Sequence, residues 1–241
     1  MANEIKQIET NATYQDVPSI LSSIDNSYAE AVVVSNEIDR TNGNIFVWKN
    51  SGTSNGGTVY LGCSGFGEMQ RDVSYVDIKW FGAKGDYYIW SATGTDDTQA
   101  IQGALSYATN NELEIYLSKG KYRITAAGAT QPYLLLLGSA GSGNSIRIFG
   151  AGAEHSSLVY DGTDNSKTIL KIESIGNVGV TVENFEIRGN EQARYGVGIH
   201  TFSTLPLHMS NMRFLLLDMG VYAEATNNAY FNNCLFDYLT Y

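Results

Sequence analysis

Short runs of apolar and β-branched residues, separated by glycine, serine and asparagine, recur along most of the chain. Runs of this length between turn-forming residues are typical of β-strands. They predict strands at 31–34, 45–48, 58–61, 113–117, 121–125, 133–137, 145–149, 157–160 and 168–172. The continuous apolar run at 133–137 favours a parallel sheet that is buried on both faces. The pattern therefore predicts an all-β protein.

One segment has helical spacing instead. Its small and apolar residues form a single stripe, made of Ala100, Ile101, Ala104, Leu105 and Ala108. Asp96 as N-cap with Gln99 three residues later has the form of a capping box, and Asp97 adds negative charge at the positive end of the helix. We therefore predict one amphipathic helix, from about Asp97 to Ala108, whose small-residue face packs closely on a core.

An internal repeat runs through the C-terminal half. Segments 182–187, 209–214 and 231–236 each read apolar, any, Asn, any, any, apolar, with asparagine spacings of 211 − 184 = 27 and 233 − 211 = 22. A second series places Gly196 and Gly220 at a spacing of 220 − 196 = 24. Such a period matches one coil of a solenoid, in which like residues stack in columns about 4.8 Å apart. Asn184, Asn211 and Asn233 are predicted to form one column at an inward turn, where they bond backbone groups.

Three motifs, at 81–86, 95–102 and 118–124, resemble in order and spacing the entrance module of phage tailspikes and other virus-borne polysaccharide depolymerases of the pectate-lyase-like superfamily. The resemblance implies a right-handed parallel β-helix that begins near residue 113 and whose open N-terminal end is covered by the helix. The residues of this structural cap motif are Phe81, Gly82, Gly85, Asp86, Asp96, Asp97 and Ile101. The loop at 87–94 departs from the family pattern, because it is longer and more aromatic than the usual short polar link.

The resemblance and the residue pattern divide the chain into four parts. Residues 1–30 form a polar arm with a short helical segment at 16–24, which is either a frayed terminus or a docking or oligomerising segment. Residues 31–78 form a small β-module, 79–125 the entrance cap of the β-helix, and 126–241 its first coils. Because the last repeat has no capping segment, we expect the chain to be the N-terminal part of a longer protein.

Charge and composition exclude several classes of function. The net charge of −10 and the absence of a basic run disfavour a nucleic-acid-binding role. The N-terminus has neither a basic start nor an apolar run, so we predict no signal peptide and no membrane insertion, with synthesis in the host cytoplasm. Cys63 and Cys234 are far apart in sequence, which favours reduced, buried thiols. Turn and N-cap roles explain Asp86, Asp96 and Asp97 more simply than a metal site does, and we expect no cofactor.

Enzymes that this chain resembles cut polysaccharides with two or three carboxylates on the outer face of neighbouring coils or in a groove between subunits. The acids expected to point outward are Glu183, Glu186, Asp218, Glu224 and Asp237. The repeat places Glu186 beside Arg213 and His200 beside Glu224, as neutralised pairs. Catalytic residues thus stay unknown, with Glu224, Asp237 and Asp218 as candidates, and we predict that residues 1–241 alone do not cleave glycan.

The resemblance implies the virion-anchoring N-terminal part of a homotrimeric tailspike or tail fibre, located in the virion tail. Its partners would be phage tail or baseplate proteins through the N-terminus and a host surface glycan through the C-terminal part. Outward-facing Phe185, Met212 and Leu215, which need covering, support a trimer. Two alternatives stay open: a non-catalytic adhesive fibre, and a free polysaccharide lyase or glycoside hydrolase of the same fold.

Overall fold

The computed structural model describes residues 74–138, 145–173, 179–189, 196–202, 206–226 and 228–239, and the backbone of five strands before residue 74. The chain forms two compact units. One comprises residues 1–74 and 79–82, and the other comprises residues 75–78 and 83–241. In the described part of the chain, no helix has the length and apolar character needed to cross a membrane.

The first unit contains a five-stranded sheet in the order β1-β2-β3-β5-β4. Its strands are β1 (Ile5–Glu9), β2 (Glu30–Val34), β3 (Ile45–Lys49), β4 (Val59–Leu61) and β5 (Glu68–Arg71). β1 pairs in parallel with β2, and the other pairs are antiparallel. Because β1 lies within the range assigned to the arm, the arm and the β-module share one sheet. The helical segment predicted at 16–24 lies outside the described residues.

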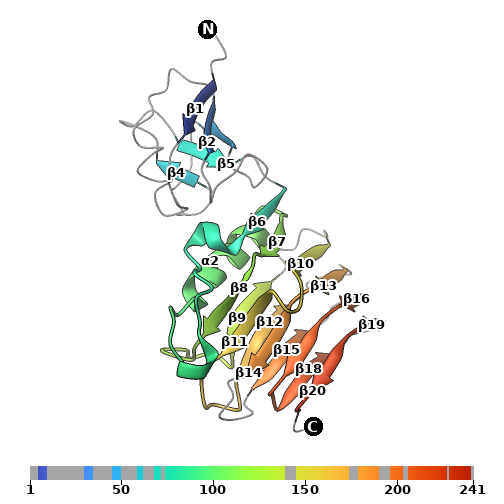
Figure 1. Ribbon diagram of the computed structural model, residues 1–241. Helices are drawn as coiled ribbons and strands as arrows, with labels where there is room; N and C mark the ends of the chain where they lie inside the picture. Colours follow the sequence, from blue (N-terminus) through green and yellow to red (C-terminus); the bar gives the residue numbers. More distant parts are fainter. Residues whose placement is uncertain are drawn as a thin grey trace. The chain divides into compact units, whose positions relative to one another are not determined.

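The second unit is built from three parallel sheets (Figure 1). Sheet 1 contains β6 (Tyr75–Asp77), β7 (Glu114–Leu117), β10 (Ile146–Gly150), β13 (Val180–Glu183), β16 (Leu207–Ser210) and β19 (Ala229–Asn232). Sheet 2 contains β8 (Gly120–Ile124), β11 (Ser156–Tyr160), β14 (Glu186–Gly189), β17 (Arg213–Leu215) and β20 (Leu235–Asp237). Sheet 3 contains β9 (Tyr133–Gly138), β12 (Thr168–Glu173), β15 (Val197–Phe202) and β18 (Met219–Glu224).

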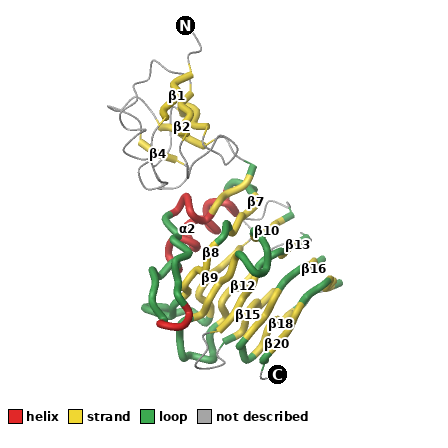
Figure 2. Tube along the Cα trace, viewed as in Figure 1, coloured by secondary structure: helices red, strands yellow, loops and turns green. Residues whose placement is uncertain are grey.

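Successive strands fall in successive sheets, so the chain winds around one axis and each coil lies directly on the coil before it (Figure 2). This arrangement is a parallel β-helix, as the sequence predicts. Sheet 1 starts earlier than predicted, because Tyr75–Asp77 pairs with β7 ahead of the first full coil. The strand β6 is followed along the chain by the short 3₁₀ helix η2 (Ile78–Phe81).

Apolar residues stack in columns inside the coils. In sheet 1 the register places Ile115, Ile148, Val182 and Met209 on one another, all buried. Sheet 2 contributes a second buried column, made of Tyr122, Leu158, Ile187 and Phe214. Burying each such side chain stabilises the fold by about 1.5–3 kcal/mol. The core is therefore continuous along the axis, with each coil contributing one layer.

The helix α2 (Thr98–Asn110) covers the N-terminal end of this core and packs against β9, β6 and β7. Ile101, Ala104, Leu105 and Ala108 are buried, as the stripe predicts. The capping box was a wrong prediction. Asp97 is the N-cap residue and its side chain makes no capping hydrogen bond. The carboxylate of Asp96 accepts hydrogen bonds from the backbone N–H and hydroxyl of Thr98, at 3.1 and 2.5 Å.

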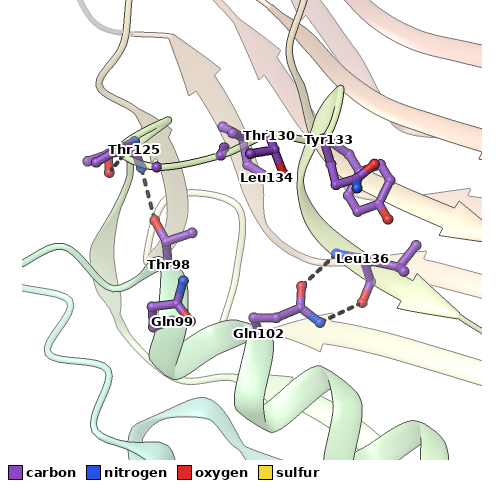
Figure 3. A pocket seen from close by; sticks show the side chains of 12 residues that line it. Thr98, Gln99, Gln102, Thr125, Thr130, Tyr133, Leu134 and Leu136 are labelled. Atoms are coloured by element: carbon purple, nitrogen blue, oxygen red, sulfur yellow. Dashed lines mark hydrogen bonds between the residues drawn. The ribbon is translucent and has the colours of Figure 1, made fainter.

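A side chain of α2 closes the free edge of sheet 3. Gln102 Oε1 accepts a hydrogen bond from the backbone N–H of Leu136 at 2.8 Å, and Gln102 Nε2 donates to the Leu136 carbonyl at 3.1 Å (Figure 3). These are the two bonds that a neighbouring strand would make. One amide side chain thereby takes the place of the missing strand beside β9, the first strand of this sheet.

The asparagine column lies at the surface and not at an inward turn. Asn211 Nδ2 donates to Asn184 Oδ1 at 3.0 Å, and Asn233 Nδ2 donates to Asn211 Oδ1 at 2.7 Å. All three residues have left-handed backbone conformations, with φ of 64°, 51° and 50°. Asparagine adopts this conformation more readily than most residues. The side-chain amides thus bond to one another at a corner where the chain turns from sheet 1 into sheet 2.

Two other predictions from the repeat were wrong. Phe185 and Met212 are fully buried, because the left-handed asparagine before each one breaks the strand alternation and turns the next side chain inward. Leu215 does lie on the outer side of sheet 2 but is 9% exposed. The glycine series was also misaligned. Val197 pairs with Met219, an offset of 219 − 197 = 22 residues, so Gly196 does not stack on Gly220.

Candidate functional site

The three candidate catalytic acids lie on different parts of the coil surface. Glu224 ends β18 in sheet 3, Asp237 ends β20 in sheet 2, and Asp218 lies in the turn between β17 and β18. Glu224 Oε2 is 3.1 Å from His200 Nε2, across a diagonal of the sheet, since the residue directly opposite His200 is Tyr222. Asp237 stacks on Leu215. The three acids therefore occupy two sheets and the turn between them, and neither Glu224 nor Asp237 pairs with another acid in the strand register.

Glu186 is a buried carboxylate on the outer side of sheet 2. It lies directly opposite Arg213, as the repeat predicts, and is only 6% exposed. The hydroxyl of Ser157 donates to Glu186 Oε1 at 3.0 Å, and the guanidinium groups of Arg188 and Arg213 lie 3.7 Å from the carboxylate. A carboxylate with these partners is held as a hydrogen-bond acceptor, which fits a structural role.

Sheet 1 carries a cluster that the sequence did not single out. Arg147 on β10 bridges two glutamates: its NH1 is 3.0 Å from Glu114 Oε2, and its NH2 is 2.5 Å from Glu183 Oε1. The hydroxyl of Ser210 donates to the second oxygen of Glu183 at 3.2 Å. The hydrogen bond to Glu183 raises the pKa of Arg147, with the charge of Glu114 as a further cause. This outer face therefore joins strands of four successive coils through charged groups.

Aromatic rings adjoin this charged group. The Arg147 guanidinium lies 4.4 Å from the centre of the Phe149 ring, within cation–π range. The rings of Phe149 and Tyr116 are 5.0 Å apart, and Tyr75 meets Tyr116 edge to face at 5.8 Å. We call Tyr75, Glu114, Tyr116, Arg147, Phe149 and Glu183 the sheet 1 face. Strand alternation was the available signal for it, because Glu114 with Tyr116 and Arg147 with Phe149 have the same spacing in neighbouring strands.

Two hollows lie beside the cap. The first, of about 310 Å³, is lined mainly by neutral residues of α2 and of the segment from Thr125 to Leu136 (Figure 3). The second, of about 490 Å³, lies over the ion pair between Arg123 Nε and Asp161 Oδ2, at 2.7 Å. Many polar atoms of both hollows already bond within the protein. The Thr125 hydroxyl, for example, donates to the Asp96 carboxylate and accepts a hydrogen bond from the backbone N–H of Ala127. The sheet 1 face differs from both hollows in combining several aromatic rings with charged side chains, and we take it as the candidate binding surface.

The residues of the cap motif hold the loop that leads into α2. Phe81 ends η2, and Gly82 follows it with φ 98°. Asp97 is 1% exposed, and its carboxylate accepts hydrogen bonds from the backbone N–H groups of Lys84 at 2.7 Å and Gly85 at 3.1 Å. Burial raises the pKa of Asp97 in spite of these bonds. Gly82 and Gly85 thus have a backbone role, and Asp97 has internal hydrogen-bond partners.

The described residues contain no group of three histidine, cysteine or acidic side chains placed to hold a metal ion. Cys234 is a free, partly buried thiol, and Cys63 lies outside the described part of the chain.

Comparison with known proteins shows which family this β-helix resembles. Residues 75–238 match the protein family described as rhamnogalacturonase A/epimerase, pectate lyase-like. Depolymerase 1, capsule K3-specific, from Klebsiella phage KP32 is 30% identical over 180 residues, which is 70% of this chain and 20% of that protein. This chain thus spans about a fifth of the length of that relative.

Two solved structures also resemble the chain. Pantoea stewartii WceF, a glycan biofilm modifying enzyme with a bacteriophage tailspike-like parallel β-helix fold, covers 98% of this chain with 42% of its own, at 12% identity and a TM-score of 0.52. The Azotobacter vinelandii mannuronan C-5 epimerase AlgE4 A-module covers 68% of this chain with 50% of its own, at 17% identity and a TM-score of 0.47. The family match covers more than half of the sequence and includes the cap and every coil of the β-helix. The chain therefore belongs to the rhamnogalacturonase A/epimerase, pectate lyase-like family.

Proposed function

We propose that this chain is part of a phage tail protein, a tailspike or tail fibre, that recognises a polysaccharide on the surface of the host cell. The observation that carries the proposal is the similarity to a capsule-specific phage depolymerase over most of the chain. Membership of a pectate lyase-like family is consistent with it. The alternatives, an adhesive fibre without catalysis and a free enzyme of the same fold, differ from it in activity and in location.

The sheet 1 face is the surface that we assign to glycan contact. Its half-buried rings, Tyr116 and Phe149, pack on each other and on Arg147, and their exposed parts offer apolar surface for the C–H groups of a sugar. Arg147 and Glu114 pair with each other beside these rings, and their side chains stay 41% and 45% exposed, so sugar hydroxyls can reach them. Because neighbouring coils repeat about every 4.8 Å, successive sugars of an extended chain could contact successive strands.

The remaining assignments are part of the same proposal. Residues 1–30 and the β-module up to residue 78 attach the protein to phage tail or baseplate proteins, and the protein acts as a homotrimer in the virion tail after synthesis in the host cytoplasm. The parallel sheets support a trimer in a general way, since such sheets are normally covered on both faces. Light scattering on the complete protein should give three times the chain mass, and a monomer mass would remove the trimer from the proposal.

Location in the virion tests the first part directly. An antibody against the 241-residue chain, used with gold labels in electron microscopy, should mark the tails of particles produced from the genome that encodes the chain. If the antibody instead detects the protein in the culture medium when no phage particles are present, the free enzyme is favoured.

Glycan contact on sheet 1 is tested separately. Phe149→Ala should weaken binding to an array of bacterial surface polysaccharides by about tenfold or more, which corresponds to about 1.4 kcal/mol. Phe202→Ala, which removes a 42% exposed ring from sheet 3, serves as the matched control. Equal binding by both variants and the unaltered chain would show that the sheet 1 face is not the contact surface.

A further inference from the structure

The loop between Asp86 and Thr95 is closed by its own hydrogen bonds. Thr95 donates its backbone N–H and its hydroxyl to the Asp86 carboxylate, at 2.8 and 3.0 Å, which closes the base of the loop. Above this base Tyr88 and Thr93 form an antiparallel bridge, with N–H to carbonyl distances of 2.8 and 3.4 Å. The tip is the 3₁₀ turn η3 (Ile89–Ser91), after which Ala92 adopts φ 50°.

The same loop exposes two large aromatic side chains. Trp90 is 77% exposed, more than any other large hydrophobic residue in the described part of the chain, and Tyr88 is 60% exposed. Tyr87, in contrast, is 3% exposed and anchors the loop in the protein. Rings with this exposure contribute little to stability by burial. An ordered loop that presents exposed rings is a common form of binding surface, since little flexibility is lost on binding.

The chemistry of the loop favours an uncharged, hydroxyl-rich ligand. Between Tyr87 and Thr95 no side chain is charged, and the polar side-chain groups are the phenol of Tyr88 and the hydroxyls of Ser91 and Thr93, which hydrogen-bond to each other at 2.6 Å. Antibody binding loops have a similar composition, with tyrosine and tryptophan next to serine and glycine. In those loops the rings provide rigid contact area and the hydroxyls provide adaptable hydrogen bonds. The net charge of −10 disfavours approach of a polyanionic glycan.

The size of the surface points to sugar and not to a protein. Fully buried aromatic side chains cover about 150–250 Å² each, so the two rings offer a few hundred Å² at most. A stable protein interface buries roughly 800 Å² on each partner. Two rings match one or two sugar residues instead.

We propose that Tyr88 and Trp90 form a second carbohydrate-binding site, in the cap, for uncharged hexopyranose units of a glycan. This inference rests on the proposed function for the kind of ligand, but it assigns a site on the cap loop, whose base pairs with β8 of sheet 2, and not on the sheet 1 face. The sugar stacks its C–H face on the indole ring of Trp90, and its hydroxyls bond to the loop and to water.

The test uses the whole 241-residue chain on an array of bacterial surface polysaccharides and of neutral and acidic hexose oligosaccharides, followed by calorimetry with the neutral glycans that bind. Trp90→Ala should weaken binding of neutral glycans at least tenfold, and Trp90→Phe should restore most of it. Tyr238→Ala removes a ring that is also 60% exposed, and it should leave binding unchanged. Because these side chains are exposed, circular dichroism of all three variants should match that of the unaltered chain.

The outcomes separate this inference from the proposed function. If a glycan binds and both Trp90→Ala and Tyr88→Ala bind it as the unaltered chain does, the second site is refuted and the proposed function stands. If no glycan on the array binds, this site and the assignment of the sheet 1 face both fail, and labelling of phage tails still decides whether the chain is part of a tail protein. A variant that keeps glycan binding but changes the oligomeric mass in light scattering would show that the loop contacts protein, which also overturns the inference.

Discussion

At the scale of single residues, Gly85 combines a left-handed backbone conformation with close packing against neighbouring atoms. It has φ 64°, and a Cβ added there would lie 2.8 Å from Tyr122 Cε1 and 2.9 Å from the Gly120 Cα. Gly85→Ala should therefore reduce the free energy of unfolding by about 3 kcal/mol or more, since left-handed strain alone costs about 1–2 kcal/mol. Urea denaturation measures this loss.

Gly82→Ala is the matched control for crowding. Gly82 also has a positive φ, 98°, but a Cβ there would meet nothing within 4 Å. Gly82→Ala should therefore reduce the free energy of unfolding only by the cost of backbone strain, about 1–2 kcal/mol. Equal losses at the two positions would show that close approach to β8 does not constrain the cap.

Asp86 should make the stability of the cap depend on pH. The hydrogen bond from the backbone N–H of Thr95 lowers the pKa of Asp86, and the Thr95 hydroxyl adds to this effect. A carboxyl with a lowered folded pKa contributes stability that is present above its unfolded pKa, about 3.9, and is lost as pH falls through the folded value. In Asp86→Asn, the fall of the melting temperature below about pH 4 should be shallower. An unchanged profile would contradict this prediction.

At the scale of elements, the contact between α2 and β9 depends on Gln102. Gln102→Ala leaves the N–H and carbonyl of Leu136 without these partners. The expected loss is about 1–3 kcal/mol in the free energy of unfolding, because part-buried backbone groups are costly to leave unpaired. Gln99→Ala, one turn earlier and exposed, should change stability by less than about 0.5 kcal/mol. Similar losses in the two variants would refute the role of Gln102 at the sheet edge.

The asparagine ladder combines a side-chain and a backbone contribution, and two substitutions separate them. Asn211→Gly keeps the left-handed conformation and removes both amide bonds, whereas Asn211→Ala also forces an alanine to φ 51°. Unfolding by denaturant should show a loss of about 1–2 kcal/mol for glycine, with a further 1–2 kcal/mol for alanine. If glycine were as stable as asparagine, the ladder bonds would contribute nothing.

The elements that sequence alone could predict are those set by local pattern. The stripe of α2 and the strands of the coils agree with the structure to within one or two residues, because burial follows spacing there. β5 was missed because Glu-Met-Gln-Arg has no strand pattern, and its conformation comes from pairing with β3 and β4. The direction of Phe185 and Met212 depended on the backbone of the preceding asparagine, which strand alternation does not encode.

The candidate site was less predictable than the fold for a related reason. Glu186 beside Arg213 follows from a single repeat offset, and the prediction holds. The sheet 1 face needs the register of strands separated by more than 30 residues, such as β7 and β10, where no repeat motif was visible. The exposure of Trp90 was likewise hidden, since an aromatic loop residue in a sequence is as easily read as part of a core.

At the scale of the whole molecule, we predict that the 241-residue chain does not cleave glycan. Hydrolysis requires two carboxyl groups about 5–9.5 Å apart with different proton affinities. Glu224, Asp237 and Asp218 lie on different parts of the coil surface, and Glu186 and Glu183 are paired with arginines. Incubation with capsule or lipopolysaccharide should release no new reducing ends. Turnover that Glu224→Gln or Asp237→Asn abolished would identify those acids as catalytic.

The covered end of the β-helix also gives the molecule a direction of growth. The N-terminal part of a protein leaves the ribosome first, so α2 and β9 are available before later coils exist. With Gln102 already occupying one edge of β9, an arriving strand can pair only on the opposite edge. Each coil then serves as the template for the next one, in the order in which the chain is made. Coils are therefore added in the order of synthesis, each one on the edge of β9 or of a later strand that faces away from the cap.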